Sequence, residues 1–143
     1  MRLVLDTDVF LAGLRSRRGA SRLLLRAGLT EHYHWLMSPA LFLEYEAVVT
    51  RPENLRALQW TDEDADLLLS GIAEVIRPVS FDFLWRPQLK DAGDEMVLET
   101  AVNGQANALV TFNVRHFQPA AGHLGISLLR PGELLARYSE ILR

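Results

Sequence analysis

The segment RLVLDTDVF at residues 2–10 joins a short apolar stretch to two acidic side chains that follow it directly. Residues 2–5 have the length and composition of a buried strand, which we expect to end at Asp6. A carboxylate at the end of a buried strand cannot remain in an apolar core without a partner, because its removal from water is costly. The segment therefore predicts a core strand with a polar site at its carboxyl end.

Further short apolar stretches alternate with helical patterns along the rest of the chain. Strands are expected at residues 34–37, 75–79, 108–111 and 126–129. Helices are expected at residues 9–14, 21–29, 38–50, 61–72, 94–102 and 131–141, and loops at residues 80–93 and 112–125. Because parallel strands are joined by crossover helices, this order predicts an α/β fold with a central, mainly parallel sheet and helices on both faces.

Several helix starts are marked by side chains that can accept hydrogen bonds from free backbone N–H groups. Ser21 is expected to cap the second helix, and Ser38 to cap the third, with Pro39 at its first position. Thr61 precedes three acidic residues, which is typical of an acidic helix N-terminus.

The composition excludes several classes of protein. A chain of 143 residues, of which 49% are hydrophobic, suits one domain at residues 1–143 and is too apolar to be disordered. The lack of cysteine excludes disulfides and thiolate metal sites. No run of about 18 apolar residues predicts a membrane span, and the first residues lack the pattern of a secretion signal, so we expect a cytoplasmic protein without membrane partners.

The net charge of −3 argues mildly against tight binding to nucleic acid, which favours a basic surface. The basic residues are fourteen arginines and a single lysine, Lys90. Arginine suits bidentate contact with phosphate, but an excess of arginine over lysine equally reflects genome composition. A group of carboxylates around a metal ion would leave the rest of the surface close to neutral or positive.

Acidic side chains gather at two strand–helix junctions. Asp6 and Asp8 follow the first strand, and Asp91 and Asp94 stand three residues apart at the start of a later helix. Such carboxylates can converge on a metal ion, but Asp8 and Asp91 are equally explained as helix caps. Glu95 points about 100° away from Asp94 around the helix, so we expect it to be solvated.

The strand at residues 108–111 places further polar groups at the same edge of the sheet. Thr111 could orient a carboxylate or a water, and Asn113 could bind a metal ion or serve as a turn residue. Glu44 lies on the helix that starts at Ser38, and its periodicity does not distinguish it from its neighbour Glu46.

Oxygen ligands of this kind suit Mg²⁺ or Mn²⁺ better than Zn²⁺. The histidines lack the spacing of a zinc site, so we expect none of them to be a metal ligand: they are His32, His34, His116 and His123.

Taken in order, four pieces of the chain resemble the PIN-domain family, especially the toxins of type II toxin–antitoxin systems. The matching pieces are VLDTDVF at 4–10, Ser38-Pro39 leading to Glu44, Asp91 with Asp94, and VTFNVRHF at 110–117. The resemblance implies a three-layer α/β/α sandwich and a Mg²⁺- or Mn²⁺-dependent endoribonuclease. It also implies an RNA substrate, a cognate antitoxin as protein partner, and a homodimer.

The resemblance also implies roles for individual residues. Asp6, Glu44 and Asp94 match the core acidic positions, with Asp91 nearby as a further metal ligand and Thr7, Asp8, Thr111 and Asn113 in support. Asp8 stands where the family most often has Asn, and Asn113 where many members have a fourth Asp; the second change weakens a second metal position. Asp94 is a candidate to orient or deprotonate the attacking water. Candidates to contact the RNA backbone are Arg15, Arg17, Arg18 and Arg22, which could equally form a solvated helix face, with Arg115 and His116 as weaker candidates.

Two rival interpretations remain open. A phosphatase of the haloacid dehalogenase type would use Asp6 as its nucleophile, although Phe10 stands where that class prefers Thr or Val. Alternatively, the fold could bind RNA or protein without cutting, which Asn113 makes credible. Trp60 and the apolar run FDFLW at 81–85 are candidates for an interface, whereas Trp35 is expected in the core.

Overall fold

The computed structural model describes residues 1–81 and 87–142 of the chain. In these residues, five parallel strands form one sheet in the order β3-β2-β1-β4-β5. Their bounds are β1 Arg2–Leu5, β2 His34–Met37, β3 Arg77–Pro78, β4 Ala108–Val110 and β5 Ser127–Leu129. The strands predicted from apolar stretches are therefore present, and the sheet is parallel throughout.

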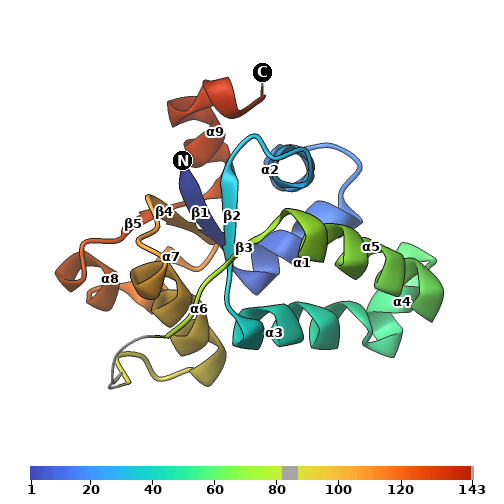
Figure 1. Cartoon of the computed structure of the whole chain (residues 1–143), viewed down its shortest axis with the longest axis horizontal. Helices are drawn as coiled ribbons and strands as arrows, with labels where there is room; N and C mark the ends of the chain where they lie inside the picture. Colours follow the sequence, from blue (N-terminus) through green and yellow to red (C-terminus); the bar gives the residue numbers. More distant parts are fainter. Residues whose placement is uncertain (82–86, 143) are drawn as a thin grey trace.

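Helices connect the strands and lie on both sides of them, with α6 and α8 at the left of Figure 1 and α1, α4 and α5 at the right. Their bounds are α1 Thr7–Arg15, α2 Ala20–Leu29, α3 Pro39–Val49, α4 Pro52–Leu58, α5 Asp62–Val75, α6 Ala92–Asn103, α7 Val114–Phe117, α8 Ala120–His123 and α9 Pro131–Arg137, followed by the 3₁₀ turn η1 Ser139–Leu142. The predicted three-layer α/β/α sandwich is confirmed.

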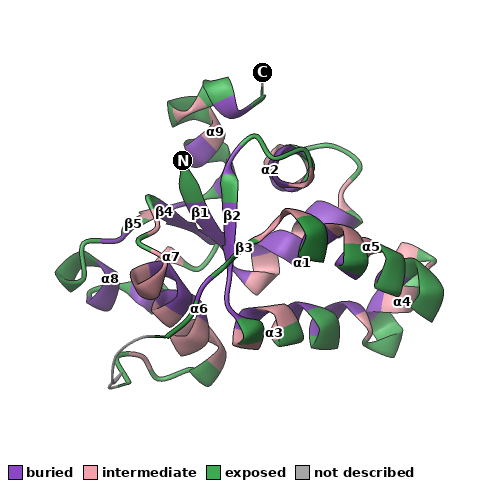
Figure 2. Cartoon of the chain, viewed as in Figure 1, coloured by how far each residue is buried: buried purple, intermediate pink, exposed green. Residues whose placement is uncertain are grey.

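The core lies between the sheet and the inner faces of the helices, where Figure 2 shows the buried residues. Phe10 of α1 stacks on Tyr45 of α3, with ring centroids 4.0 Å apart and planes 8° from parallel. The Tyr45 hydroxyl donates a hydrogen bond of 2.6 Å to the carbonyl oxygen of Leu5, the last residue of β1. Trp35 is fully buried, as predicted. These aromatic contacts hold two helices against the carboxyl end of the central strand.

The register of the two central strands brings their carboxyl ends together. Leu5 of β1 lies opposite Val110 of β4, and the Asp6 N–H donates to the Val110 carbonyl at 2.9 Å. Asp6 and Thr111, the residues that follow the two strands, therefore start from neighbouring points on the same edge.

The edge of the sheet at β3 consists of two residues only. Leu36 pairs with Arg77, and Met37 pairs with Pro78. The prediction that Pro78 would confine this strand to an edge is confirmed, because proline has no N–H to offer to a further strand.

The predicted caps of α3 and α5 are confirmed. The Ser38 hydroxyl accepts a hydrogen bond from the Leu41 N–H at 3.2 Å, and Thr61 forms a capping box with Asp64. The predicted cap of α2 is wrong: the helix begins at Ala20, and Ser21 is buried inside it. Gly19 stands at the N-cap with a φ of 111°, a backbone conformation that glycine adopts without strain.

Three short helical segments were not predicted. Residues 112–125, expected as a loop, contain α7 and α8, and α4 follows α3 directly. The predicted C-terminal helix ends at Arg137 instead of residue 141 and continues as the 3₁₀ turn. Helices of four to seven residues are too short to repeat an apolar period, so the sequence carries little signal for them.

Candidate functional site at the carboxyl ends of the strands

Asp6 is almost completely buried, at 5% exposure, and its carboxylate has two different donors. One oxygen accepts from the Thr7 N–H at 2.8 Å and caps α1, and the other accepts from the Thr111 hydroxyl at 2.7 Å. The pKa of Asp6 is raised from its ordinary 3.8 to about 7, mainly by burial and also by the negative charges of Asp8 and Asp94, while the hydrogen bonds from Thr111 and Thr7 act in the opposite direction. Asp6 is therefore held rigidly in a place that disfavours its own negative charge.

Asp8 lies in the first turn of α1, so the alternative that it caps this helix is wrong; the cap is Asp6. Its Oδ2 atom accepts from the Asn113 side-chain amide at 2.9 Å and from the Phe112 N–H at 3.3 Å. Its Oδ1 atom is buried and has no hydrogen-bond partner among the described residues. Burial raises the pKa of Asp8 as well. One carboxylate oxygen of Asp8 is thus buried without a hydrogen-bond donor among the described residues.

Asn113 belongs to this network through two bonds. Its N–H donates to the Thr111 hydroxyl at 2.9 Å, and its side chain donates to Asp8. Asn113 is therefore linked to the Asp8 carboxylate, which is compatible with the supporting role proposed for it. Asn113 lies three residues after the end of β4. The alternative that Asn113 is a turn residue is compatible with its hydrogen bond to Asp8.

Asp94 and Asp91 stand at the start of α6. The Asp91 carboxylate accepts a hydrogen bond from the Asp94 N–H at 2.9 Å and caps the helix. Of the two roles predicted for Asp91, helix cap and metal ligand, the first is confirmed. Asp94 lies 3.4 Å from Nδ1 of His116. Burial and the charge of Asp91 raise the pKa of Asp94, whereas His116 lowers it. The charges of Asp6, Asp8 and Asp94 thus influence one another across the carboxyl ends of the strands.

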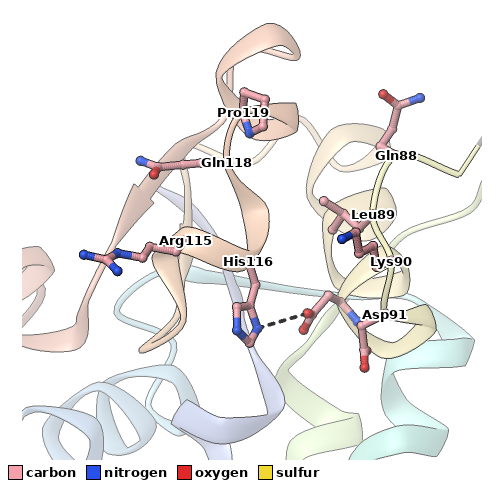
Figure 3. Close-up of a pocket in the computed structure, with 9 residues that line it drawn as sticks. Gln88, Leu89, Lys90, Asp91, Arg115, His116, Gln118 and Pro119 are labelled. Carbon is pink, nitrogen blue, oxygen red and sulfur yellow. Dashed lines mark hydrogen bonds and ion pairs between the residues drawn. The ribbon is translucent and has the colours of Figure 1, made fainter.

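A cavity of about 500 Å³ opens beside Asp94. Figure 3 shows its two walls, one from the chain that leads into α6 and the other from α7 and the residues after it. In that view His116 points across the cavity toward the wall of Lys90 and Asp91, whereas the side chain of Arg115 points away from it. The lining residues are Gln88, Leu89, Lys90, Asp91, Asp94, Arg115, His116, Gln118 and Pro119.

His116 was not expected to take part in the site beyond a weak phosphate contact. The sequence shows that it follows Asn113 by three residues, but only the short helix α7 turns it toward Asp94. A histidine paired with a candidate ligand could have been inferred only if α7 had been recognised.

The expectation that Glu95 is solvated is wrong. Its carboxylate accepts from the N–H groups of Gln88 at 2.8 Å and Leu89 at 2.7 Å, so it fixes the chain that forms one cavity wall. Free N–H groups in a loop that folds back over a helix require acceptors, and the sequence does not show that fold-back.

Glu44 is half-buried on α3, beside Tyr45. The hydrogen bonds and ion pairs of the described residues do not link it to Asp6, Asp8 or Asp94. Within the same residues, no group of three or more His, Asp or Glu side chains is arranged so that it could hold a metal ion. The carboxylates are therefore close enough to interact electrostatically, without forming a complete set of ligands.

The arginines predicted to contact RNA fall into three places. Arg15, Arg17 and Arg22 line one hollow, Arg18 lines a second, and Arg115 lines the cavity beside Asp94. Of the predicted interface residues, Trp60 is half-buried and Phe81 is 39% exposed, and the rest of that run, residues 82–85, lies outside the described residues.

Comparison with known families agrees with this arrangement. Residues 2–115 match the PIN domain family, and the chain belongs to that family. PIN domains are in general nucleases and typically use divalent metal ions. The match favours this class over the phosphatases considered above. A search of curated proteins found no match to the chain. No helix in the described residues is long and apolar enough to cross a membrane.

Proposed function

We propose that this PIN domain is a divalent-metal-dependent endoribonuclease whose site is formed by Asp6, Asp8 and Asp94. The observation that carries the proposal is the unpartnered, buried Oδ1 atom of Asp8, next to Asp6 with its pKa of about 7. Carboxylates in such surroundings repel one another and lose hydration. A bound cation would compensate for both costs, and oxygen donors suit such an ion, although the three carboxylates of the described residues are not yet arranged as a complete set of ligands.

The donor atoms favour Mg²⁺ or Mn²⁺, because they are all oxygens and no cysteine is available. We assign Asp6 and Asp94 as metal ligands, with Asp91 and Glu44 as further candidates that the family resemblance supports. Thr111 holds the Asp6 carboxylate in place, and Asn113 does the same for Asp8. Asn113 also leaves one negative charge fewer than a fourth Asp would, which favours a single metal ion.

The bound ion would polarise the scissile phosphate and lower the pKa of a water molecule. Asp94, which lines the cavity, would orient a water molecule and accept its proton, while hydrogen bonds hold the Asp6 and Asp8 carboxylates in place. The water oxygen forms a new bond to phosphorus, and the bond from phosphorus to the 3′ oxygen breaks. The products are a 5′ phosphate and a 3′ hydroxyl, which takes up a proton.

A biological role as the toxin of a toxin–antitoxin pair follows from the resemblance of the four sequence pieces to that branch of the family. On this proposal the domain at residues 1–143 acts in the cytoplasm as a homodimer. A cognate antitoxin would then inhibit it by covering the acidic site.

The proposal is tested by incubating a mixed pool of single-stranded RNA with the protein, with and without Mg²⁺ or Mn²⁺. We expect cleavage only with metal, and a loss of about 100-fold or more in the Asp6→Asn variant. Asp66→Asn is the control, because Asp66 is an exposed acid on α5 outside the site. Equal activity of wild type and Asp6→Asn would overturn the proposal.

A non-catalytic role in binding RNA is the second candidate. It is favoured by Asn113 and by the lack of a ready-made set of three ligands among the described residues. In the same experiment, RNA binding by the wild type without cleavage at any metal concentration would select this candidate.

A further inference from the structure

A hollow of about 380 Å³ lies away from Asp94, between the end of α1, the start of α2 and the junction of α4 and α5. We call it the arginine hollow. It is lined by Leu14, Arg15, Ser16, Arg17, Arg22, Ala57, Leu58, Gln59 and Trp60.

The arginine hollow carries three positive charges and no acidic lining residue. The ion pairs of the described residues involve other side chains, so Arg15, Arg17 and Arg22 have no carboxylate partner there. Arg22 is half-buried and is oriented by a hydrogen bond of 3.3 Å from its guanidinium to the Gly13 carbonyl. Three like charges around one hollow favour an anion, and guanidinium groups bind phosphate in a bidentate manner.

Gln59 and Trp60 line the arginine hollow together with the arginines. Gln59 ends α4 in the left-handed conformation, with φ of 58°, and the Trp60 N–H donates to the Leu55 carbonyl at 2.9 Å. This turn brings an amide side chain and a half-buried indole to the hollow. An aromatic surface beside cationic groups is the combination that binds single-stranded nucleic acid through stacked bases and backbone phosphates.

A different hollow, next to the arginine hollow, reaches from Arg15 to Asp8 of the acidic site. It is lined by Asp8, Leu11, Ala12, Arg15 and Ser16, so it shares Arg15 and Ser16 with the arginine hollow. Asp8, Leu11 and Arg15 lie on one face of α1, because they are separated by three, four and seven residues. Along the helix axis, Asp8 and Arg15 are about 10 Å apart. At the spacing of about 3.4 Å per nucleotide along one strand of a DNA duplex, about three nucleotides cover that length.

We propose that the arginine hollow binds backbone phosphates of single-stranded RNA about three nucleotides away from the scissile bond, with one base against Trp60. This inference rests on the proposed ribonuclease function and adds a binding site to it. It assigns Arg15, Arg17 and Arg22 to the substrate path and leaves Arg18, which lines another hollow, outside it.

The test measures binding without cleavage. A fluorescein-labelled single-stranded RNA of about twelve nucleotides is titrated in EDTA at several KCl concentrations, and its anisotropy is followed. Each lost phosphate contact should lower the slope of log Kd against log salt concentration by about 0.7. We expect this change for Arg17→Ala and for Arg22→Ala. Arg56→Ala is the matched control, because Arg56 is exposed on α4 but does not line the arginine hollow.

Trp60 is tested in the same assay. Trp60→Leu should weaken binding by about 5- to 100-fold at every salt concentration without changing the slope, because base stacking releases no counterions. Trp60→Phe keeps an aromatic ring and should restore most of the affinity, even where the leucine variant is less stable.

The outcomes separate this inference from the proposed function. Equal slopes for Arg17→Ala, Arg22→Ala and Arg56→Ala would overturn the arginine hollow as an RNA site, whether or not the wild type cleaves. Arginine-dependent binding by a wild type that does not cleave would support the hollow and remove only the catalytic proposal. Wild type that neither binds nor cleaves RNA would overturn both.

Discussion

Asp6 combines a structural and a chemical role, since it caps α1 and also carries the most perturbed charge of the site. With a folded pKa of about 7 and an ordinary value of 3.8, the folded protein keeps a proton on Asp6 that the unfolded chain has already released at intermediate pH. Unfolding then releases a proton, so stability falls as the pH rises through this range. The metal-free site therefore opposes folding under the conditions in which it would bind a metal ion best.

We expect the melting temperature of the metal-free protein, measured in EDTA, to fall between about pH 4 and pH 7 through the contribution of Asp6. Asp6→Asn cannot lose that proton, so its melting temperature should vary less and exceed that of the wild type at pH 8. The two proteins are compared by thermal melting at matched ionic strength. Parallel pH profiles would contradict the assignment of the raised pKa to Asp6.

Metal binding should reverse this penalty. At pH 8, a divalent ion at about 100 times its Kd would stabilise the folded wild type by about 2.7 kcal/mol. Asp6→Asn should show little of this gain, because on the proposed function Asp6 supplies a negatively charged ligand to the ion. Thermal melting with Mn²⁺, Mg²⁺ and a Ca²⁺ series measures the effect. A gain of equal size in the variant would place the ion elsewhere.

Asn113 can be changed to the acid that many family members have. Asn113→Asp removes the amide donor to Asp8 and adds a like charge, so we expect a loss of about 1 kcal/mol in metal-free stability. The same change should tighten binding of Mn²⁺, measured by calorimetry, because it adds a negative charge at the site. Unchanged Mn²⁺ affinity would show that this position does not face the ion.

At the scale of elements, the contact between α3 and the end of β1 sets the position of Asp6. Tyr45→Phe removes only the hydrogen bond to the Leu5 carbonyl and keeps the ring that stacks on Phe10. We expect a loss of about 1 kcal/mol in stability together with reduced RNA cleavage.

Tyr33→Phe is the matched control for this prediction. Tyr33 is also buried and donates to a backbone carbonyl, that of Leu24, at 2.8 Å, but it lies on no strand end of the site. It should lose similar stability, measured by urea unfolding, and keep full activity. Equal activity of both variants would show that the β1–α3 contact does not affect the site.

The elements also show what could be predicted from the sequence. The strands were predictable because each is a short apolar run with a polar residue directly after it, as in residues 2–6. The caps Ser38 and Thr61 were predictable because a hydroxyl precedes a helical pattern. The same reasoning placed the residues after β1 and β4 at one edge, and that is where Asp6 meets Thr111 and Asp8 meets Asn113.

Other features depend on the path of loops, which no local pattern encodes. The pair of Asp94 and His116 requires the four-residue helix α7, and the role of Glu95 requires the fold-back of residues 88–89. Glu44 is a different case, because it was predicted from the family resemblance and not from a local pattern. Its assignment rests on the family resemblance, and the described contacts give it no place beside the other carboxylates. The fold was therefore predictable from the sequence, whereas the pairing of side chains across loops was not.

At the scale of the whole molecule, the net charge of −3 conceals a separation of charges. Acidic groups gather after the strands, whereas Arg15, Arg17 and Arg22 share a hollow without acids. The overall charge therefore does not argue against a polyanionic substrate, because the field that such a substrate meets is local. The composition could not show this separation, because it gives the number of charged residues and not their positions in the fold.

The two-residue strand β3 has a consequence for the behaviour of the protein at high concentration. An exposed sheet edge normally offers N–H and C=O groups to which a strand from another molecule can add, and such addition leads to aggregates. At β3 the strand is short, and Pro78 has no N–H to donate. A strand from another molecule therefore finds few hydrogen-bonding groups at this edge, and we expect the β3 edge not to support fibre formation.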